Sequence, residues 1–290
     1  MTSPTVKVVQ STDGTTIFAE ASGDPRNPHI VLLAGLGLSG CVFDDMCANP
    51  ALLSSVYIVR YDVRGHGRSG KPTVAEAYES KLFADDFKTV MDAFNLHKPI
   101  LAGWSMGSVV ATDVSTHLPL GTLSGVVYLS GMPATGEVAL SMVPSGLLSA
   151  IPGLLSKDDV VASEASVVEF TNRLFAHPEA VPYGIKCMYL GQRLHPEIAN
   201  FSLSRTVDVE KLWAAGKDGL PLLIVQGTAD AHRAGGPKGV EEVMKPHFKT
   251  YEAIWLEGRG HALHYESPEE IVDILVNFAK KVGGKDYRSV

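Results

Sequence analysis

Short apolar runs alternate with amphipathic segments along most of this chain. The apolar runs predict buried strands at residues 29–34, 56–61, 99–102, 125–130, 221–225 and 253–256. Residues 79–94 carry apolar side chains at helical spacing, and the same spacing predicts a final helix from about Pro268. Short, wholly apolar strands separated by amphipathic helices are typical of an α/β fold, in which helices cover both faces of a mostly parallel sheet.

The first twenty residues follow a different pattern. Apolar and polar residues alternate over 6–9, and a second run returns over 15–19. Asp13 and Gly14 between the two runs are a common turn pair. The pattern predicts a β-hairpin ahead of the parallel sheet.

Residues 132–216 interrupt the alternation of strands and helices. They show helical patterning and several proline and glycine breaks, but no convincing strand. We expect a helical insertion, so that residues 1–131 and 217–290 form the core and 132–216 form a cap, or lid. Such an insertion covers the sheet edge where ligands bind, and its apolar stretch at 143–155 favours an apolar pocket. Packing as an extra helical layer is a compatible alternative.

Composition narrows the possible partners. The chain has 290 residues and a net charge of −7, with no basic stripe, so binding to nucleic acid or to an anionic membrane is not expected. No apolar run reaches the roughly 18 residues of a membrane span, and residues 1–7 lack a secretory signal. Three cysteines without a C-x-x-C pair favour free thiols and predict a cytoplasmic protein.

The sequence GWSMG at residues 103–107 is the strongest chemical motif. It follows a predicted buried strand and precedes a helical pattern, as a nucleophile elbow of the form G-x-S-x-G does. Gly103 and Gly107 leave room for a sharp turn that would hold Ser105 at the N-terminus of the following helix. The free N–H groups and the helix dipole there favour a developing negative charge.

A serine nucleophile needs a base, and the base needs an acid that orients it. Asp230 follows the predicted strand at 221–225, and His261 follows the one at 253–256, so both lie at the same sheet edge as Ser105. Asp208 and Asp218 precede the strand and would lie at its opposite end. For the base, His264 is better explained as packed or solvated, and His232 as a residue at the mouth of the site.

With these residues, the chain resembles α/β-hydrolase-fold serine hydrolases with a helical cap, over nearly its whole length. DVRGHGRS at residues 62–69 is similar to the family's D-x-R-G-x-G-x-S loop, in which His66 would belong to a structural turn. The resemblance implies Ser105 as nucleophile, Asp230 as acid and His261 as base.

Two backbone N–H groups would form the oxyanion hole, from Met106 after the nucleophile and from Leu36 in the loop after an early strand. Ala34 stands where the family commonly has histidine. Leu38, Trp104 and Met132 are candidate pocket residues. For Trp104 and Met106, which flank the nucleophile, packing in the core beneath the pocket is an equally good interpretation.

The sequence therefore predicts a serine hydrolase that needs no metal or cofactor and cleaves a carboxylic ester with a small or medium apolar acyl group. A carbon–carbon hydrolase, a lactonase and a cofactor-free perhydrolase or haloperoxidase are alternatives with the same triad. A ligand-binding receptor that retains the triad is an alternative from another class. The sequence leaves the oligomeric state open.

Overall fold

The computed structural model describes residues 3–233 and 238–283. In this part of the chain the strands form one eight-stranded sheet in the order β1-β2-β4-β3-β5-β6-β7-β8. The strands are β1 (Thr5–Gln10), β2 (Thr16–Ser22), β3 (His29–Leu33), β4 (Tyr57–Tyr61), β5 (Ile100–Trp104), β6 (Gly125–Leu129), β7 (Leu222–Gly227) and β8 (Tyr251–Leu256). In sheet order from β4 to β8, neighbouring strands are parallel. Strand β2 pairs antiparallel with both of its neighbours, β1 and β4. The predicted α/β fold with a mostly parallel sheet is confirmed.

The N-terminal hairpin forms as predicted. Asp13 accepts a hydrogen bond from the backbone N–H of Thr15 at 3.0 Å, and Gly14 adopts a φ of 82°. This left-handed conformation is one that glycine adopts without strain. The hairpin lies at one edge of the sheet, so the parallel strands that carry the site are not disturbed by it.

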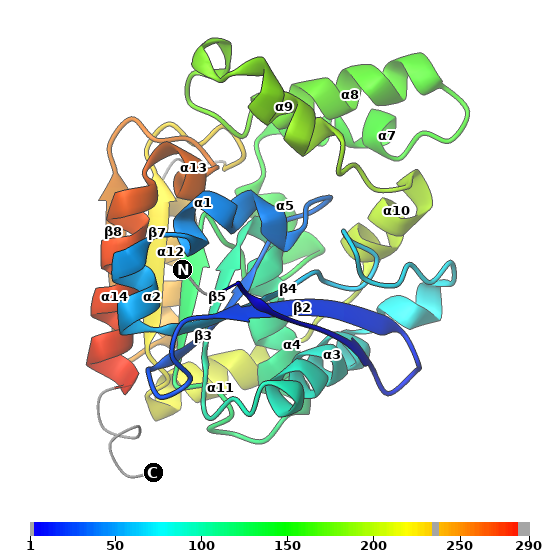
Figure 1. The fold of residues 1–290 in the computed structure, drawn as a ribbon. Coiled ribbons are helices and arrows are strands. Elements are labelled where there is room, and N and C mark those ends of the chain that lie inside the picture. Colours follow the sequence, from blue (N-terminus) through cyan, green and yellow to red (C-terminus); the bar gives the residue numbers. More distant parts are fainter. Residues whose placement is uncertain (1–2, 234–237, 284–290) are drawn as a thin grey trace.

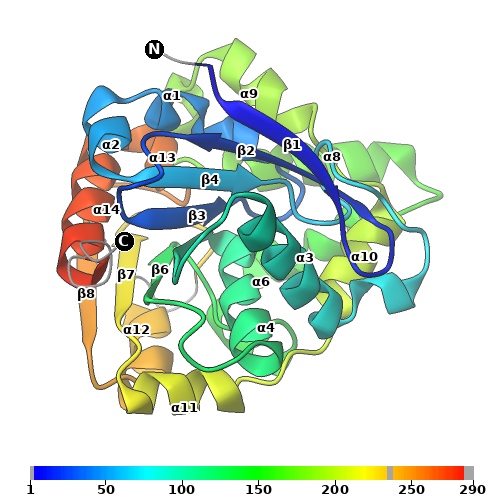
Figure 2. The ribbon, with the colours of Figure 1, turned by 60° about the horizontal axis from the view of Figure 1, so that its bottom comes forward.

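Helices cover both faces of the sheet (Figures 1 and 2). One face packs against α1 (Asp44–Cys47), α2 (Pro50–Ser55) and α14 (Pro268–Gly283), and the other against α3 (Ser80–Ala93), α4 (Val110–His117), α11 (Glu210–Asp218) and α12 (Lys238–Met244). The predicted helix at 79–94 is α3, which turns Phe83, Phe87 and Val90 into the core. No described helix is both long and apolar enough to cross a membrane.

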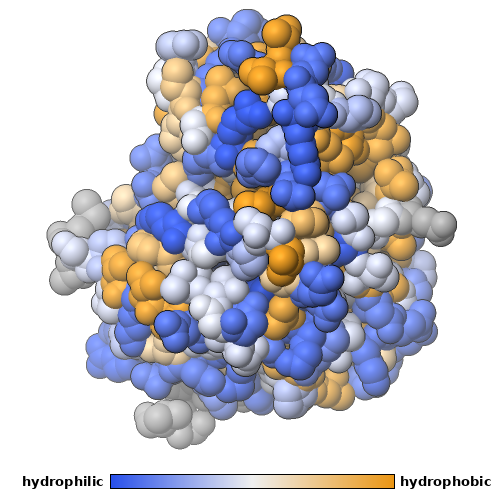
Figure 3. Space-filling view, turned by 90° about the vertical axis from the view of Figure 1, so that its right-hand side faces the viewer, coloured by the Kyte–Doolittle hydropathy of each residue, from blue (hydrophilic) through white to orange (hydrophobic). Residues whose placement is uncertain are grey.

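Residues 130–221, all of them described, contain helices and no strand between β6 and β7. These helices are α5 (Glu137–Met142), α6 (Ser145–Leu148), α7 (Ile151–Leu154), α8 (Val160–Asn172), α9 (Tyr183–Leu190) and α10 (Pro196–Ser204), followed by α11. In Figure 1, α7, α8 and α9 lie above the ends of the strands. Figure 3 shows hydrophobic residues among hydrophilic ones on one side of this helical segment.

Helix α11 crosses the boundary that the sequence predicts at residue 216. It packs against α4 on the face of the sheet, because Leu212 and Trp213 are buried there. Helix α11 therefore belongs to the layer of helices beside the sheet, whereas α7, α8 and α9 lie above the ends of the strands (Figure 1).

Candidate active site

Ser105 lies in a strained turn at the end of β5. Its φ is 53°, a left-handed conformation that non-glycine residues rarely adopt, and a 3₁₀ turn over Ser105–Val109 leads into α4. The two glycines that flank Ser105 have no room for a side chain. A Cβ on Gly103 would lie 2.2 Å from Cα of Ser108, and one on Gly107 would lie 2.5 Å from the carbonyl oxygen of Ala34.

Asp230 lies in the loop after β7, buried at 8% exposure. Its Oδ2 accepts hydrogen bonds from Nδ1 of His261 at 2.8 Å and from Nε2 of Gln226 at 2.5 Å, and its Oδ1 accepts from the backbone N–H of His232 at 2.7 Å. Burial alone would raise the pKa of Asp230, but the hydrogen bond from His261, and the charge that this imidazole carries when it is protonated, hold the pKa below its ordinary value. Asp230 is therefore a carboxylate at neutral pH.

His261 follows β8 and is fully buried. The Trp104 indole donates a hydrogen bond to the backbone carbonyl of His261 at 2.8 Å, which fixes the loop beside the elbow. Burial lowers the pKa of His261, and Asp230 opposes this shift only in part, so the imidazole is neutral near pH 7. With Nδ1 donating to Asp230, Nε2 carries the free lone pair that a general base needs.

Nε2 of His261 is buried and has no hydrogen-bond partner among the described residues. The Ser105 hydroxyl likewise has no hydrogen bond to a described residue. In structures without substrate, the hydrogen bond between nucleophile and base is often long and shortens only in the complex. Both groups therefore keep hydrogen-bonding capacity that no described residue uses.

The other histidines that the sequence singled out have different surroundings. The ring of His232 stacks on that of His261, with centroids 4.4 Å apart, and burial lowers its pKa well below the ordinary value. His264 is buried against Trp104, its Nε2 lies 3.0 Å from the Tyr189 hydroxyl, and burial lowers its pKa to about 3. His66 is buried in its turn, and its Nδ1 lies 3.0 Å from the carbonyl oxygen of Arg64.

A cavity of about 290 Å³ opens at Ser105. It is lined by Leu36, Ser105, Met106, Met132, Thr135, Gly136, Ala139, Leu140, Val143, Leu147, Leu148, Ile151, Leu154, Leu155, Phe170, Asn200, Leu203, Ser204, His232 and Arg233. Most of these residues are apolar, and many of the apolar ones lie in the segment from α5 to α8. Asp230 and His261 do not line the cavity, and both are buried.

The cavity contains only some of the predicted pocket and oxyanion residues. Leu36, Met106 and Met132 line it, and the loop of Leu36 lies against Ser105, since a Cβ on Gly35 would be 3.0 Å from that of Ser105. Trp104 does not line it, because its side chain is fully buried in the core on the face of α14. Leu38 lines a neighbouring hollow of about 60 Å³ instead.

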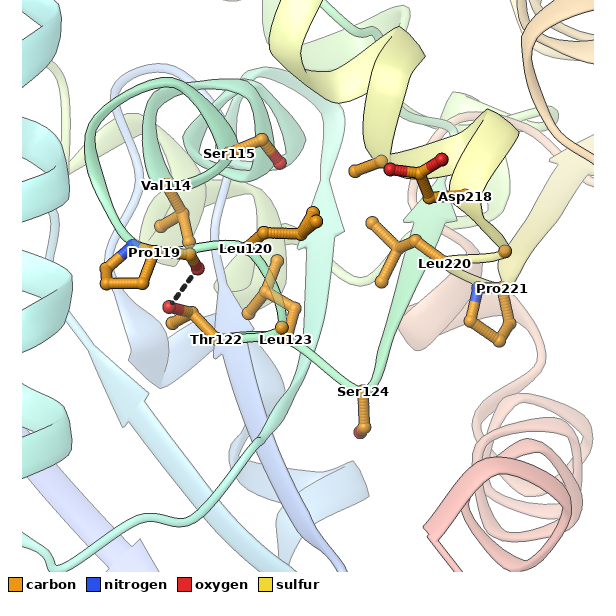
Figure 4. A pocket seen from close by; sticks show the side chains of 13 residues that line it. Val114, Ser115, Pro119, Leu120, Thr122, Leu123, Ser124, Asp218, Leu220 and Pro221 are labelled. Atoms are coloured by element: carbon orange, nitrogen blue, oxygen red, sulfur yellow. Dashed lines mark hydrogen bonds between the residues drawn. The ribbon is translucent and has the colours of Figure 1, made fainter.

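A second large hollow, of about 300 Å³, lies at the opposite end of the strands (Figure 4). It is formed by the loop at residues 119–124, before β6, and by residues 218–221, before β7. Asp218 is one of its lining residues, so the structure separates this carboxylate from Ser105 by the length of a strand. A substrate bound here would not reach the elbow.

Two polar residues of the site were missed by sequence reasoning. Gln226 is buried within β7 and donates to Asp230, and Arg233 lines the cavity. Gln226 is the one uncharged polar side chain in an otherwise apolar strand, and that signal could have indicated a contact with the acid. Among the described residues, no group of histidine, cysteine, aspartate or glutamate side chains is arranged to hold a metal ion.

Two curated proteins illustrate the sequence similarity of this chain to known proteins. The chain is 24% identical over 279 residues to the AB hydrolase superfamily protein YisY of Bacillus subtilis, covering 93% of this chain and 98% of that protein. A match to the probable oxidoreductase EphD of Mycobacterium tuberculosis is 37% identical over 94 residues, but it covers 32% of this chain and only 16% of that longer protein.

Among solved structures, the esterase RhEst1 from Rhodococcus sp. ECU1013 superposes with a TM-score of 0.81 at 24% identity, covering 96% of this chain and 99% of that one. This similarity concerns the fold. The sequence model of the alpha/beta hydrolase family matches residues 30–274, which include Ser105, Asp230 and His261. The chain therefore belongs to the alpha/beta hydrolase family.

Proposed function

We propose that this protein is a serine esterase that cleaves carboxylic esters through an acyl-enzyme. The hydrogen bond of 2.8 Å between Asp230 and His261, next to a serine in a left-handed elbow, is the observation that carries the proposal. Structural similarity to the esterase RhEst1 is consistent with it.

In this mechanism Ser105 attacks the ester carbonyl while Nε2 of His261 takes the hydroxyl proton. Asp230 keeps the imidazole in the required tautomer and stabilises the imidazolium that forms. The backbone N–H groups of Leu36 and Met106 stabilise the oxyanion. His261 then returns the proton to the leaving alcohol, and water releases the acid from Ser105 by the same route.

We further propose that the part of residues 132–216 that precedes α11 acts as a cap that sets the substrate range. The apolar walls of the cavity come largely from α5 to α8, and about 290 Å³ is enough for a small or medium acyl chain. A panel of aryl esters of increasing acyl length measures this range. Feeble hydrolysis across the whole panel would favour a specialised lactonase, carbon–carbon hydrolase or perhydrolase.

Labelling with a fluorophosphonate probe tests the nucleophile. Wild type and the control variant Ser149→Ala, whose serine is exposed in the helical segment and does not line the cavity, are expected to react. Ser105→Ala is expected not to react and to lose ester hydrolysis. Equal labelling of wild type and Ser105→Ala would show that Ser105 is not the nucleophile.

A further inference from the structure

Among the described residues that line the cavity at Ser105, Arg233 is the one with a charged side chain. It is only 6% exposed. The other lining residues are mostly aliphatic, so this guanidinium is a single positive charge at the wall of an otherwise apolar cavity. A charge in such surroundings is costly unless an anion compensates it.

No described carboxylate forms an ion pair with Arg233, whereas each of the other buried arginines has such a partner. Arg60 pairs with Glu20, Arg64 with Asp86, and Arg205 with Asp113. Asp230 is near in sequence, but its oxygens accept hydrogen bonds from His261, Gln226 and the backbone of His232. It attracts Arg233 only at longer range, and burial still lowers the pKa of the guanidinium.

The guanidinium is held in place, with part of its hydrogen-bonding capacity unused. Nη2 donates to the backbone carbonyl of Ser130, and Nη1 donates to that of His232 at 3.3 Å. Nε is buried without a hydrogen-bond partner among the described residues. Since a guanidinium has five N–H groups, three remain without a partner there.

We propose that Arg233 binds a carboxylate group of the substrate. This inference rests on the proposed esterase function and narrows its substrate class to amphiphilic esters, with a hydrocarbon part and one carboxylate besides the ester. The planar fork of the guanidinium matches a carboxylate. The apolar walls from α5 to α8 would hold the hydrocarbon part while Ser105 attacks the ester.

Two matched substrate pairs test the proposal at pH 7.5, where the carboxylates are ionised. Monoethyl adipate and ethyl hexanoate differ only by a carboxylate on the acyl side, and 4-acetoxybenzoate and 4-methylphenyl acetate by one on the alcohol side. Wild type is expected to have the higher kcat/KM for the charged ester of at least one pair. Arg233→Met is expected to lower kcat/KM for that ester by about 10- to 100-fold, with a few-fold change for its neutral partner.

Two further variants control for charge and folding. Arg233→Lys keeps the charge and is expected to retain part of the preference. Arg173→Met removes a positive charge just after the C-terminal end of α8, at a residue that does not line the cavity, and is expected to retain the whole preference. Because the readout is a ratio of two substrates, a general loss of folded protein cancels.

Equal kcat/KM within both pairs for wild type would overturn the proposal, as would an equal fall for charged and neutral esters in Arg233→Met. If no ester is hydrolysed and Ser105 is not labelled, the esterase function itself fails. Calorimetric titration with hexanoate and 1-hexanol then decides. If Arg233→Met binds hexanoate more weakly than wild type does but binds 1-hexanol equally well, the anion site is supported. Unchanged binding of hexanoate overturns it.

Discussion

Replacing Asp230 with asparagine removes one charge from the site while preserving the shape of the side chain. The carboxylate accepts three hydrogen bonds, from His261, Gln226 and the backbone of His232. An amide can accept at only one end. If its oxygen stays on the His232 N–H, its NH₂ group meets the donors of His261 and Gln226, and if it flips, the NH₂ group meets the N–H of His232.

The first orientation forces His261 to change tautomer, so that Nδ1 accepts and Nε2 carries the proton. Nε2 can then no longer take the proton of Ser105, and kcat/KM is expected to fall roughly a thousandfold to ten-thousandfold. The second orientation leaves the buried N–H of His232 without an acceptor. Either way, about 1–3 kcal/mol of the free energy of unfolding is lost.

The assay is kcat/KM for a short-chain aryl ester, together with urea unfolding of the same samples. Asp218→Asn is the matched control, because it removes an exposed carboxylate at the opposite end of the strands. It is expected to behave as wild type in both measurements. An Asp230→Asn variant that is folded and has wild-type kcat/KM would refute the assignment of Asp230 as the acid.

Two further predictions concern stability, both measured by urea unfolding. Gly103→Ala places a Cβ 2.2 Å from Cα of Ser108 and is expected to lower the free energy of unfolding by about 1–3 kcal/mol or more. In the control variant Gly184→Ala the new Cβ meets no atom within 4 Å, so the free energy of unfolding should change little. A stable, active Gly103→Ala protein would contradict the geometry of the elbow. Burial lowers the pKa of His66 to about 4 and that of His264 to about 3, both from 6.5, so the folded state binds fewer protons than the unfolded state below pH 6.5. The protein therefore keeps its full free energy of unfolding above pH 6.5, where both histidines are neutral in either state. As the pH falls below this value, the free energy of unfolding decreases by up to about 1.4 kcal/mol per pH unit for each histidine. His66→Gln is expected to flatten this dependence, and an unchanged slope would show that His66 is not a neutral buried group.

Local pattern was sufficient for most of the fold and for the order of the candidate triad. The strands and the N-terminal hairpin have clear periodicities, and Asp230 and His261 each follow a buried strand directly, which places them at one edge of a parallel sheet. Contacts between distant segments could not be predicted in this way. Trp104 and Met132 are both apolar residues near strand ends, yet only Met132 faces the cavity, because Trp104 is turned to the opposite core.

The elbow and the loop of His261 are in contact in the fold, although they are far apart in the chain. The indole of Trp104 donates a hydrogen bond to a carbonyl oxygen 157 residues later. During synthesis, β5 and its turn are therefore complete long before the last two strands that carry the acid and the base. Under the proposed mechanism, Ser105 remains an ordinary alcohol until β7 and β8 have joined the sheet. Nascent or C-terminally truncated chains that lack β7 or β8 would thus not cleave esters. The onset of ester cleavage would mark the moment at which the sheet is completed.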